Sequence, residues 1–418
     1  MNYVIMTVLC TLLLVASHLP GVAAGAESGK KQVPAKVTVT FPLGAATPSE
    51  VCGECHKAIY REHSHGFGSD NPAMKIRSTA SNKRGAGPSF AATPKGTSHA
   101  LAGVDSFPLH ARDVEEEGKS CNTCHFPQPF ILPDLDIPDV AKPLSRLKAE
   151  ESGGLTCASC HLTPEGKIRA PYNLRAPHEN FPDVRMKTAV MCATCHSLGK
   201  RVVGKQTQTY LEWREDYWKK GLGYNCQYCH MPRTNRRLAE DYDVPERVAA
   251  RHLWTGGRSL QRLQSALSQA VVQPEPGAAL FEVHLLNIGA GHSVPTGSNR
   301  RAVYLYAEVQ DVQGKVVARQ EWLFAPWYGD RPDDKAFLAE DRKLPDAVAA
   351  MQADAQGPHE PIIRAGEERI LRWSPPLKPG KYSITTRLVY DLNRYNDRAV
   401  SDDQAVLGST RTEVTVTN

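Results

Sequence analysis

The pattern of hydrophobic and polar residues changes at about residue 273 of this 418-residue chain. Beyond that point, short runs alternate between apolar and polar residues, and Gln313-Gly314 and Pro379-Gly380 mark turns. Strands with one buried face show this period of two. Residues 273–418 are therefore predicted to form an all-β sandwich domain. Its clearest strands are expected at 302–311, 381–390 and 410–417.

Before residue 273, apolar periodicity predicts only two longer helices. One is expected from Gln206 to Lys220, ending at Gly221, a residue type that often terminates helices. The other is expected from Ser259 to Val271. Its apolar face would comprise Leu260, Leu263, Leu267 and Val271. The segment from about 47 to 254 is rich in Cys, His and Pro, which predicts a mostly irregular region with short helices.

An apolar run from Val4 to Ala16 has the length of a signal peptide and is too short to span a bilayer. Small residues follow it, so cleavage is expected after Ala24 or Ala26. Residues 1–24 are predicted to be a signal peptide and 25–47 a linker. The chain is then expected in the periplasm or at the cell surface, and no later segment is predicted to span a membrane.

Five Cys-x-x-Cys-His motifs lie between residues 48 and 272. They begin at residues 52, 121, 157, 192 and 226, and the last three spacings of 36, 35 and 34 residues indicate a repeated unit. The two thiols of such a motif can add to the vinyl groups of one porphyrin while the His binds the iron. Zinc, the alternative for paired cysteines, would not require a His after every pair.

The motifs therefore predict five covalently bound haems c, and residues 48–272 are predicted to be a pentahaem cytochrome c domain packed around them. The expected haem-binding cysteines are Cys52, Cys55, Cys121, Cys124, Cys157, Cys160, Cys192, Cys195, Cys226 and Cys229. The expected proximal ligands are His56, His125, His161, His196 and His230. The one cysteine outside the motifs, Cys10, lies in the apolar leader, so the exported chain is expected to have no thiol for a disulfide or a nucleophile.

The formal net charge of +5 would by itself suit a nucleic acid or an anionic membrane. Ten haem propionates would contribute about −10, and each oxidised iron porphyrin core returns about +1. The holo-protein is then expected to be near neutral when oxidised. No basic run or aromatic-interleaved patch supports nucleic-acid binding, so no nucleic-acid partner is expected.

The second axial ligand decides whether a haem only carries electrons or also reacts. Methionine is scarce and nine histidines remain outside the motifs and the leader, so bis-His haems are expected. After the first motif, His65 is preferred to His63, and before the second motif His110 is preferred to His99. Three further predicted distal ligands are His178, His252 and His292, and His178 has no competing histidine nearby. Two histidines expected to be structural are His284 and His359.

Cys52-Gly-Glu-Cys-His-Lys-Ala-Ile-Tyr60, followed by Ser64-His65, resembles the opening of the multihaem cytochrome c superfamily. That group includes tetrahaem partners of hydroxylamine oxidation and cytochromes of metal-reducing bacteria. Cys226-Gln-Tyr-Cys-His-Met-Pro232, His252 and Asn287-Ile-Gly-Ala-Gly-His-Ser-Val-Pro-Thr-Gly297 resemble a recurrent C-terminal module of these proteins. The resemblance implies that His252 and His292 bind haem iron.

Two classes of function fit these features. The favoured one is an electron carrier with no catalytic residue, which passes electrons between redox partners such as other cytochromes and quinol-linked or surface electron-transfer proteins. The resemblance also implies homo-oligomers or filaments for some relatives. The alternative is an oxidoreductase acting on hydroxylamine or on a small nitrogen or sulfur oxyanion at one open haem. No motif ends in Lys instead of His, a departure seen in related pentahaem nitrite reductases.

Overall fold

The fold is taken from a computed structural model, which describes residues 29–36, 47–65, 155–163, 166–172, 176–196, 209–257, 259–297, 301–326, 362–392, 394 and 404–417. The predicted leader, the second haem motif, His99, His110 and His359 lie outside these residues, as does the side chain of His65.

The first part of the described chain consists of short helices and short strands. The α-helices are α1 (Ser49–Gly53), α2 (Lys57–His65), α6 (Cys157–His161), α7 (Val190–His196), α8 (Thr209–Trp213), α9 (Cys226–His230) and α10 (Leu260–Ala266). A 3-10 helix, η2 (Val184–Lys187), and a π-helix, η4 (Arg214–Trp218), accompany them. The strands here are β1 (Ile168–Ala170), β2 (Asn180–Pro182), β3 (Arg233–Arg236) and β4 (Arg247–Ala250).

Each of the four described haem motifs lies on or at the end of a short helix. Helices α6 and α9 consist of the five motif residues themselves, α7 ends at its motif histidine, and α1 ends inside the first motif. In the first motif, Gly53 is required by packing, because a Cβ there would lie 2.6 Å from Cγ of Tyr60 on α2.

The helix predicted to end at Gly221 is confirmed for its described residues. Helix α8 continues directly into η4, and together they run from Thr209 to Trp218. The turn that follows places Gly221 at φ 79°, in the left-handed region that glycine adopts without strain.

The prediction of a helix over 259–271 is wrong for the second half of that segment. Ser259 caps α10 as expected, but α10 ends at Ala266 and the chain becomes strand β5 (Leu267–Val272), which pairs antiparallel with β6. The β-branched Val271 and Val272 favour a strand, and pairing with β6 overrides the helical periodicity. Pro274 and Pro276 consequently stand in the connection between two paired strands.

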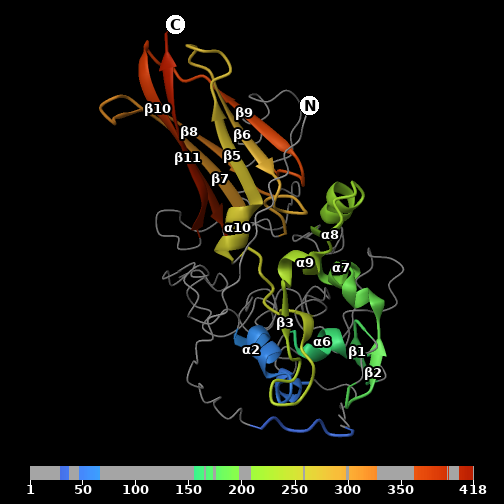
Figure 1. The fold of residues 1–418 in the computed structure, drawn as a ribbon. Coiled ribbons are helices and arrows are strands. Elements are labelled where there is room, and N and C mark those ends of the chain that lie inside the picture. The colour runs from blue at the N-terminus through green and yellow to red at the C-terminus, as the bar shows by residue number, and fades with distance from the viewer. Residues whose placement is uncertain are drawn as a thin grey trace, which may run out of the picture.

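From β5 onward the chain forms two antiparallel sheets. The strands are β6 (Phe281–Asn287), β7 (Ala302–Gln310), β8 (Val316–Phe324), β9 (Glu368–Trp373), β10 (Gly380–Asp391) and β11 (Gln404–Val416). Their order is β11-β10-β7-β8 in one sheet and β5-β6-β9 in the other. Figure 1 shows the two sheets packed as a sandwich at one end of the molecule, which confirms the predicted all-β region.

The sandwich core forms where apolar positions of the two sheets meet. Val283 and Leu285 of β6 and Val303 and Leu305 of β7 have no exposed surface. Burying each such side chain stabilises the fold by about 1.5–3 kcal/mol. Trp322 of β8 is 3% exposed and belongs to this core.

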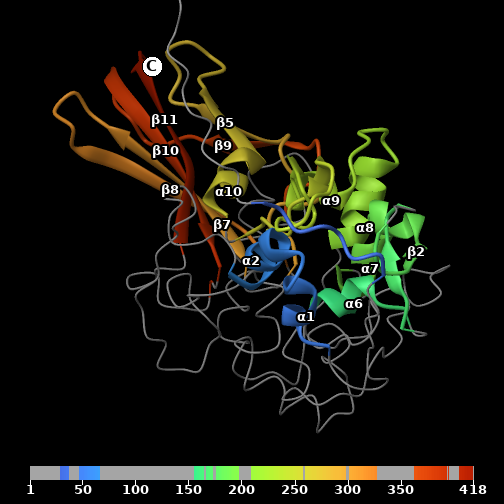
Figure 2. The same ribbon diagram turned by 60° about the horizontal axis from the view of Figure 1, so that its bottom comes forward.

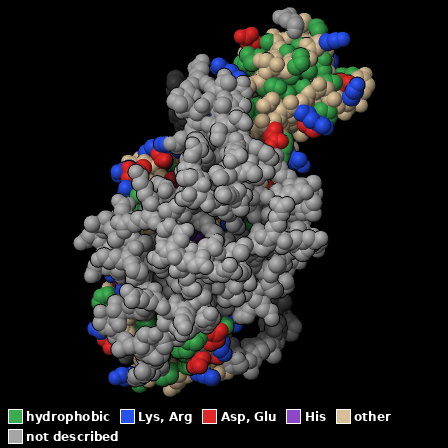
Figure 3. Space-filling model, turned by 180° about the vertical axis from the view of Figure 1, so that it is seen from behind, with side chains coloured by type: hydrophobic (Ala, Val, Ile, Leu, Met, Phe, Trp, Pro, Cys, Tyr) green, Lys and Arg blue, Asp and Glu red, His purple; other side chains and the backbone are tan. Residues whose placement is uncertain are grey.

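The sandwich meets the haem-motif region near α10 and α8. In Figures 1 and 2, α10 lies at the end of the sandwich that faces α9 and α2. The contact is close, because a Cβ on Gly257 would lie 2.9 Å from the Tyr390 hydroxyl oxygen of β10. Seen from behind in Figure 3, the described surface of the sandwich mixes hydrophobic and charged side chains. None of the helices in the described ranges has the length and hydrophobicity needed to cross a membrane.

Candidate haem-binding sites

Three motif histidines each face a second histidine across a nearly constant gap. The ring centroids are 6.2 Å apart for His56 and His178, 6.1 Å for His161 and His252, and 6.2 Å for His230 and His292. Two axial Fe–N bonds of about 2.0 Å, with each ring centre ~1.1 Å behind its nitrogen, would separate two trans imidazole centres by about 6 Å. Each gap therefore has the width that one iron between two imidazoles requires.

Backbone carbonyl groups hold the motif rings in the matching tautomer. The bonds run from His56 Nδ1 to the Leu238 oxygen (2.8 Å), from His161 Nδ1 to the Arg169 oxygen (3.0 Å) and from His230 Nδ1 to the Thr255 oxygen. An Nδ1–H that donates to a carbonyl leaves the lone pair on Nε2, where a metal binds. The fold thus fixes both the orientation and the protonation of these rings.

Burial keeps two of the facing imidazoles, those of His230 and His252, neutral near pH 7. Loss of hydration lowers the pKa of His230 to about 4 and that of His252 to about 3. The neutral ring is the form that binds a metal. No proton has to be displaced from these rings near neutral pH before they can act as ligands.

His63 is occupied by other hydrogen bonds. Its ring is 6% exposed, its Nε2 donates to the Leu155 oxygen at 2.8 Å, and its Nδ1 accepts from Trp254 Nε1–H at 3.3 Å. Both ring nitrogens therefore have partners, and neither lone pair is directed at a metal.

His284, which we expected to be structural, lies on β6 between two carboxylates. Its Nδ1 is 2.8 Å from Glu368 Oε1 and its Nε2 is 3.3 Å from Glu282 Oε2. These contacts give the ring a place in the sheet surface without any metal. The fourth described motif histidine, His196, ends α7 close to His292.

The described motif cysteines form no disulfide, and they approach one another across motifs. The Cys52 thiol contacts Cys157, and the Cys192 thiol contacts Cys226. Burial raises the pKa of the Cys160 thiol to about 12. A buried thiol with a raised pKa stays protonated near neutral pH.

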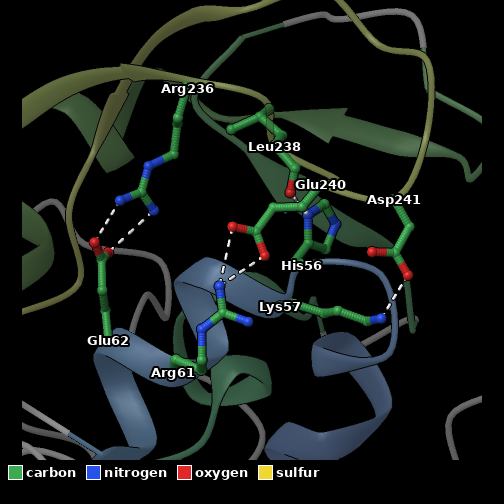
Figure 4. A network of polar contacts seen from close by, with 8 residues as sticks. All are labelled: His56, Lys57, Arg61, Glu62, Arg236, Leu238, Glu240 and Asp241. Atoms are coloured by element: carbon green, nitrogen blue, oxygen red, sulfur yellow. Dashed lines mark hydrogen bonds and ion pairs between the residues drawn. The ribbon is translucent and has the colours of Figure 1, made fainter. Parts of the chain in front are cut away.

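Helix α2 is tied to the segment that follows the fifth motif. Figure 4 shows three ion pairs across this contact: Lys57 with Asp241, Arg61 with Glu240, and Glu62 with Arg236. The same segment supplies the Leu238 carbonyl that holds His56. The first and fifth motifs, far apart in the sequence, are thereby fastened together.

Glu62 is the most enclosed member of this network, with its side chain 10% exposed. Besides Arg236, it accepts a hydrogen bond from Arg251 Nε at 2.8 Å and another from the backbone N–H of His252 at 3.0 Å. Burial acts to raise the pKa of Glu62, but the hydrogen bonds from the two arginines outweigh it and hold that pKa below its ordinary value. Sequence reasoning missed this residue because its partners lie far along the chain.

The donor set suits a haem better than a bare metal ion. Within the described ranges, no cluster of three or more Cys, His, Asp or Glu side chains could hold a metal ion. A haem needs only two protein ligands, because its porphyrin supplies four nitrogens. Facing imidazole pairs beside paired cysteines therefore fit this group.

Comparisons with known proteins extend the picture. No protein-family model matches the sequence, and no curated protein matches it. Among solved structures, a match covers 35% of this chain and 14% of a glycosyl hydrolase family 2 member from Bacteroides cellulosilyticus, but its TM-score is 0.17 at 18% identity. A penta-haem cytochrome c552 from Thermochromatium tepidum matches over 90% of this chain and 100% of its own length, with a TM-score of 0.53 and 16% sequence identity. This chain therefore has a fold similar to that of a penta-haem cytochrome.

Proposed function

We propose that this protein is an exported pentahaem c-type cytochrome that passes electrons between redox partners through a chain of mainly bis-His haems. The observation that carries the proposal is the set of three facing imidazole pairs, 6.1–6.2 Å between centroids. Each pair joins a motif histidine to one of the histidines that the sequence singled out as distal ligands. The fold similarity to a penta-haem cytochrome supports the same function.

The haems would be held by thioether bonds to the two cysteines of every motif. Three irons would take the axial pairs His56 with His178, His161 with His252, and His230 with His292. The fourth motif would hold a fourth haem, with His196 as its proximal ligand, and the second motif would hold the fifth, with His125 and His110 as its proposed ligands. When bound, each haem would supply a reversible one-electron change at its iron.

Six-coordinate irons suit electron transfer better than catalysis. An imidazole on both faces leaves no iron position for a substrate, whereas electron transfer needs none. The backbone bonds to His56, His161 and His230 keep those rings in place. Such fixed ligands limit the rearrangement that accompanies a change of iron charge.

Contacts between motif cysteines support a continuous path for electrons between the proposed haems. The contact of Cys52 with Cys157 places the proposed attachment points of the first and third haems beside each other. The contact of Cys192 with Cys226 would do the same for the fourth and fifth motifs. Cys160 and Cys192 pack in one cluster with Met186 and Met191, which would connect the two halves.

Single substitutions of the distal histidines test the assignment. His178→Ala, His252→Ala and His292→Ala should each turn one haem high-spin and let the reduced protein bind one carbon monoxide, with covalent haem content unchanged. His284→Ala is the matched control and should leave all spectra as they were, because its ring contacts carboxylates. Unaltered spectra in all three distal variants would refute the axial pairs.

A further inference from the structure

The loop that carries His292 is fastened to the haem-motif region by one carboxylate. Glu212 lies on α8, whereas Ser293 and Thr296 follow β6 of the sandwich. The backbone N–H of Ser293 donates to Glu212 Oε2 at 3.2 Å, and the Thr296 hydroxyl donates to the same oxygen at 2.6 Å. The two regions of the chain thus share a charge-assisted bond directly beside the proposed ligand.

Other contacts from α8 and η4 hold the same loop. The Thr209 and Thr296 hydroxyl oxygens are 2.9 Å apart. Gly291 lies against the aromatic rings of this helical segment, and a Cβ on it would be 3.3 Å from Cδ1 of Tyr217. The loop therefore packs closely on the helix, and a side chain just before His292 would be crowded.

The sandwich holds the loop from its other side. The buried Asn287 side chain donates from Nδ2 to the His292 oxygen at 2.9 Å and to the Ile363 oxygen at 3.0 Å. Asn287 thus fixes the backbone of the loop within the sandwich, whereas Glu212 fixes it against α8. The Glu212 contacts cross from the sandwich to the region that carries the fifth motif.

Burying the Glu212 carboxylate costs free energy, because a charged group loses hydration when it is buried. Burial raises the pKa of Glu212, which indicates that its charge has lost much of its hydration. A neutral acceptor would satisfy the two donors without this cost. The presence of Glu212 here is explained if the contact must hold the His292 loop more firmly than a neutral hydrogen bond would.

We propose that Glu212 is a positioning residue, which, through Ser293 and Thr296, seats the His292 imidazole opposite His230. The inference rests on the proposed function, since it takes His292 as the distal ligand of the fifth-motif haem. The seating is narrow, because the two rings are 6.2 Å apart and within 13° of parallel. We call Glu212, Ser293 and Thr296 the carboxylate latch. Opening the latch would withdraw the ligand and expose one iron to small molecules.

The test compares full-length holo-proteins that carry Glu212→Ala, Glu212→Gln, Thr296→Val or His292→Ala. Glu215→Gln is the control, because Glu215 lies on adjoining η4 and pairs with Arg214 and Lys219 of the same helical segment, away from the His292 loop. Carbon monoxide titration of the reduced protein and EPR of the oxidised protein report iron coordination. Covalent haem content and circular dichroism report folding.

Glu212→Ala should convert to high spin, in part or in full, the same haem that His292→Ala opens, and it should admit carbon monoxide there. Thr296→Val keeps the charge and should raise the rate of carbon monoxide binding at that haem about tenfold, the effect of losing one bond to a charged group. Glu212→Gln retains an acceptor without the charge, so it should admit carbon monoxide faster than Glu215→Gln but more slowly than Glu212→Ala. Glu215→Gln should match the unaltered protein.

The outcomes separate two failures. If His292→Ala leaves every haem low-spin, the ligand assignment in the proposed function is wrong. If His292→Ala opens a haem but Thr296→Val and both Glu212 variants bind carbon monoxide no faster than Glu215→Gln, only the latch is refuted. Should Glu212→Ala fail to fold, Thr296→Val and Glu212→Gln still decide the question.

Discussion

Replacing Glu62 removes the one carboxylate that joins α2 to Arg236, Arg251 and the His252 backbone. Arg236 is only 13% exposed, so it would lose its counter-charge in a poorly hydrated place. Breaking a buried pair in this way costs about 3–5 kcal/mol. Arg251 is 43% exposed and adds at most about 1 kcal/mol. Glu62→Ala is therefore expected to lower the free energy of unfolding by about 3–5 kcal/mol at pH 7.

The loss should depend on pH in a defined direction. The pKa of Glu62 is depressed in the folded state, so its contribution is fully present above the unfolded-state pKa of about 4.3. That contribution disappears as the pH falls through the folded-state pKa and the carboxylate is protonated. The stability difference between the unaltered protein and Glu62→Gln should therefore be largest near neutral pH and shrink below about pH 4.

Urea unfolding followed by the Soret band, at pH 7 and at acidic pH, measures both effects, since covalent haems stay attached during unfolding. Glu240→Gln is the control. Glu240 pairs with Arg61, which lies on the same helix as Glu62 and whose side chain is 58% exposed. This exposed pair should contribute little. A Glu62 variant that is no less stable than Glu240→Gln, or a difference that does not change with pH, would refute the reasoning.

Three further predictions follow from the motifs and the packing. Intact mass after acid–acetone extraction should exceed the polypeptide by five haem masses, and loss of that mass on extraction would exclude covalent attachment. Truncation before Leu267, which removes the sandwich and its proposed ligand, should open one haem to carbon monoxide, whereas a truncated protein with every haem closed would mean that the sandwich supplies no ligand. Gly53→Ala should destabilise the protein by about 1–3 kcal/mol, because its Cβ would collide with the Tyr60 ring. In contrast, Gly29→Ala, which has open space around it, should be neutral in denaturant unfolding.

The features that the sequence predicted well are those that depend on neighbouring residues. The Cys-x-x-Cys-His motifs are local, and the helices that carry them are as short as their surroundings suggested. The strand over 302–311 was predicted from its alternation, and β7 covers Ala302–Gln310. In both cases, residues a few positions apart decide the local structure.

The features that the sequence did not predict depend on distant partners. Leu267 continues the apolar spacing of α10, and only its pairing with Asn287 of β6 shows that it begins a strand. Glu62 and Glu212 look like ordinary surface charges on short helices. Their roles arise from Arg236 and Thr296, which the fold brings to them from elsewhere in the chain. A single sequence contains no local signal for such contacts.

The EPR spectrum of the fully oxidised, full-length protein tests the central claim most directly. Bis-His irons are low-spin, so the account predicts low-spin ferric signals from all five haems and no high-spin component. A stoichiometric high-spin signal that is lost when nitrite or hydroxylamine is added would contradict it. Such a signal would indicate an open haem that binds substrate and an enzyme in place of an electron carrier.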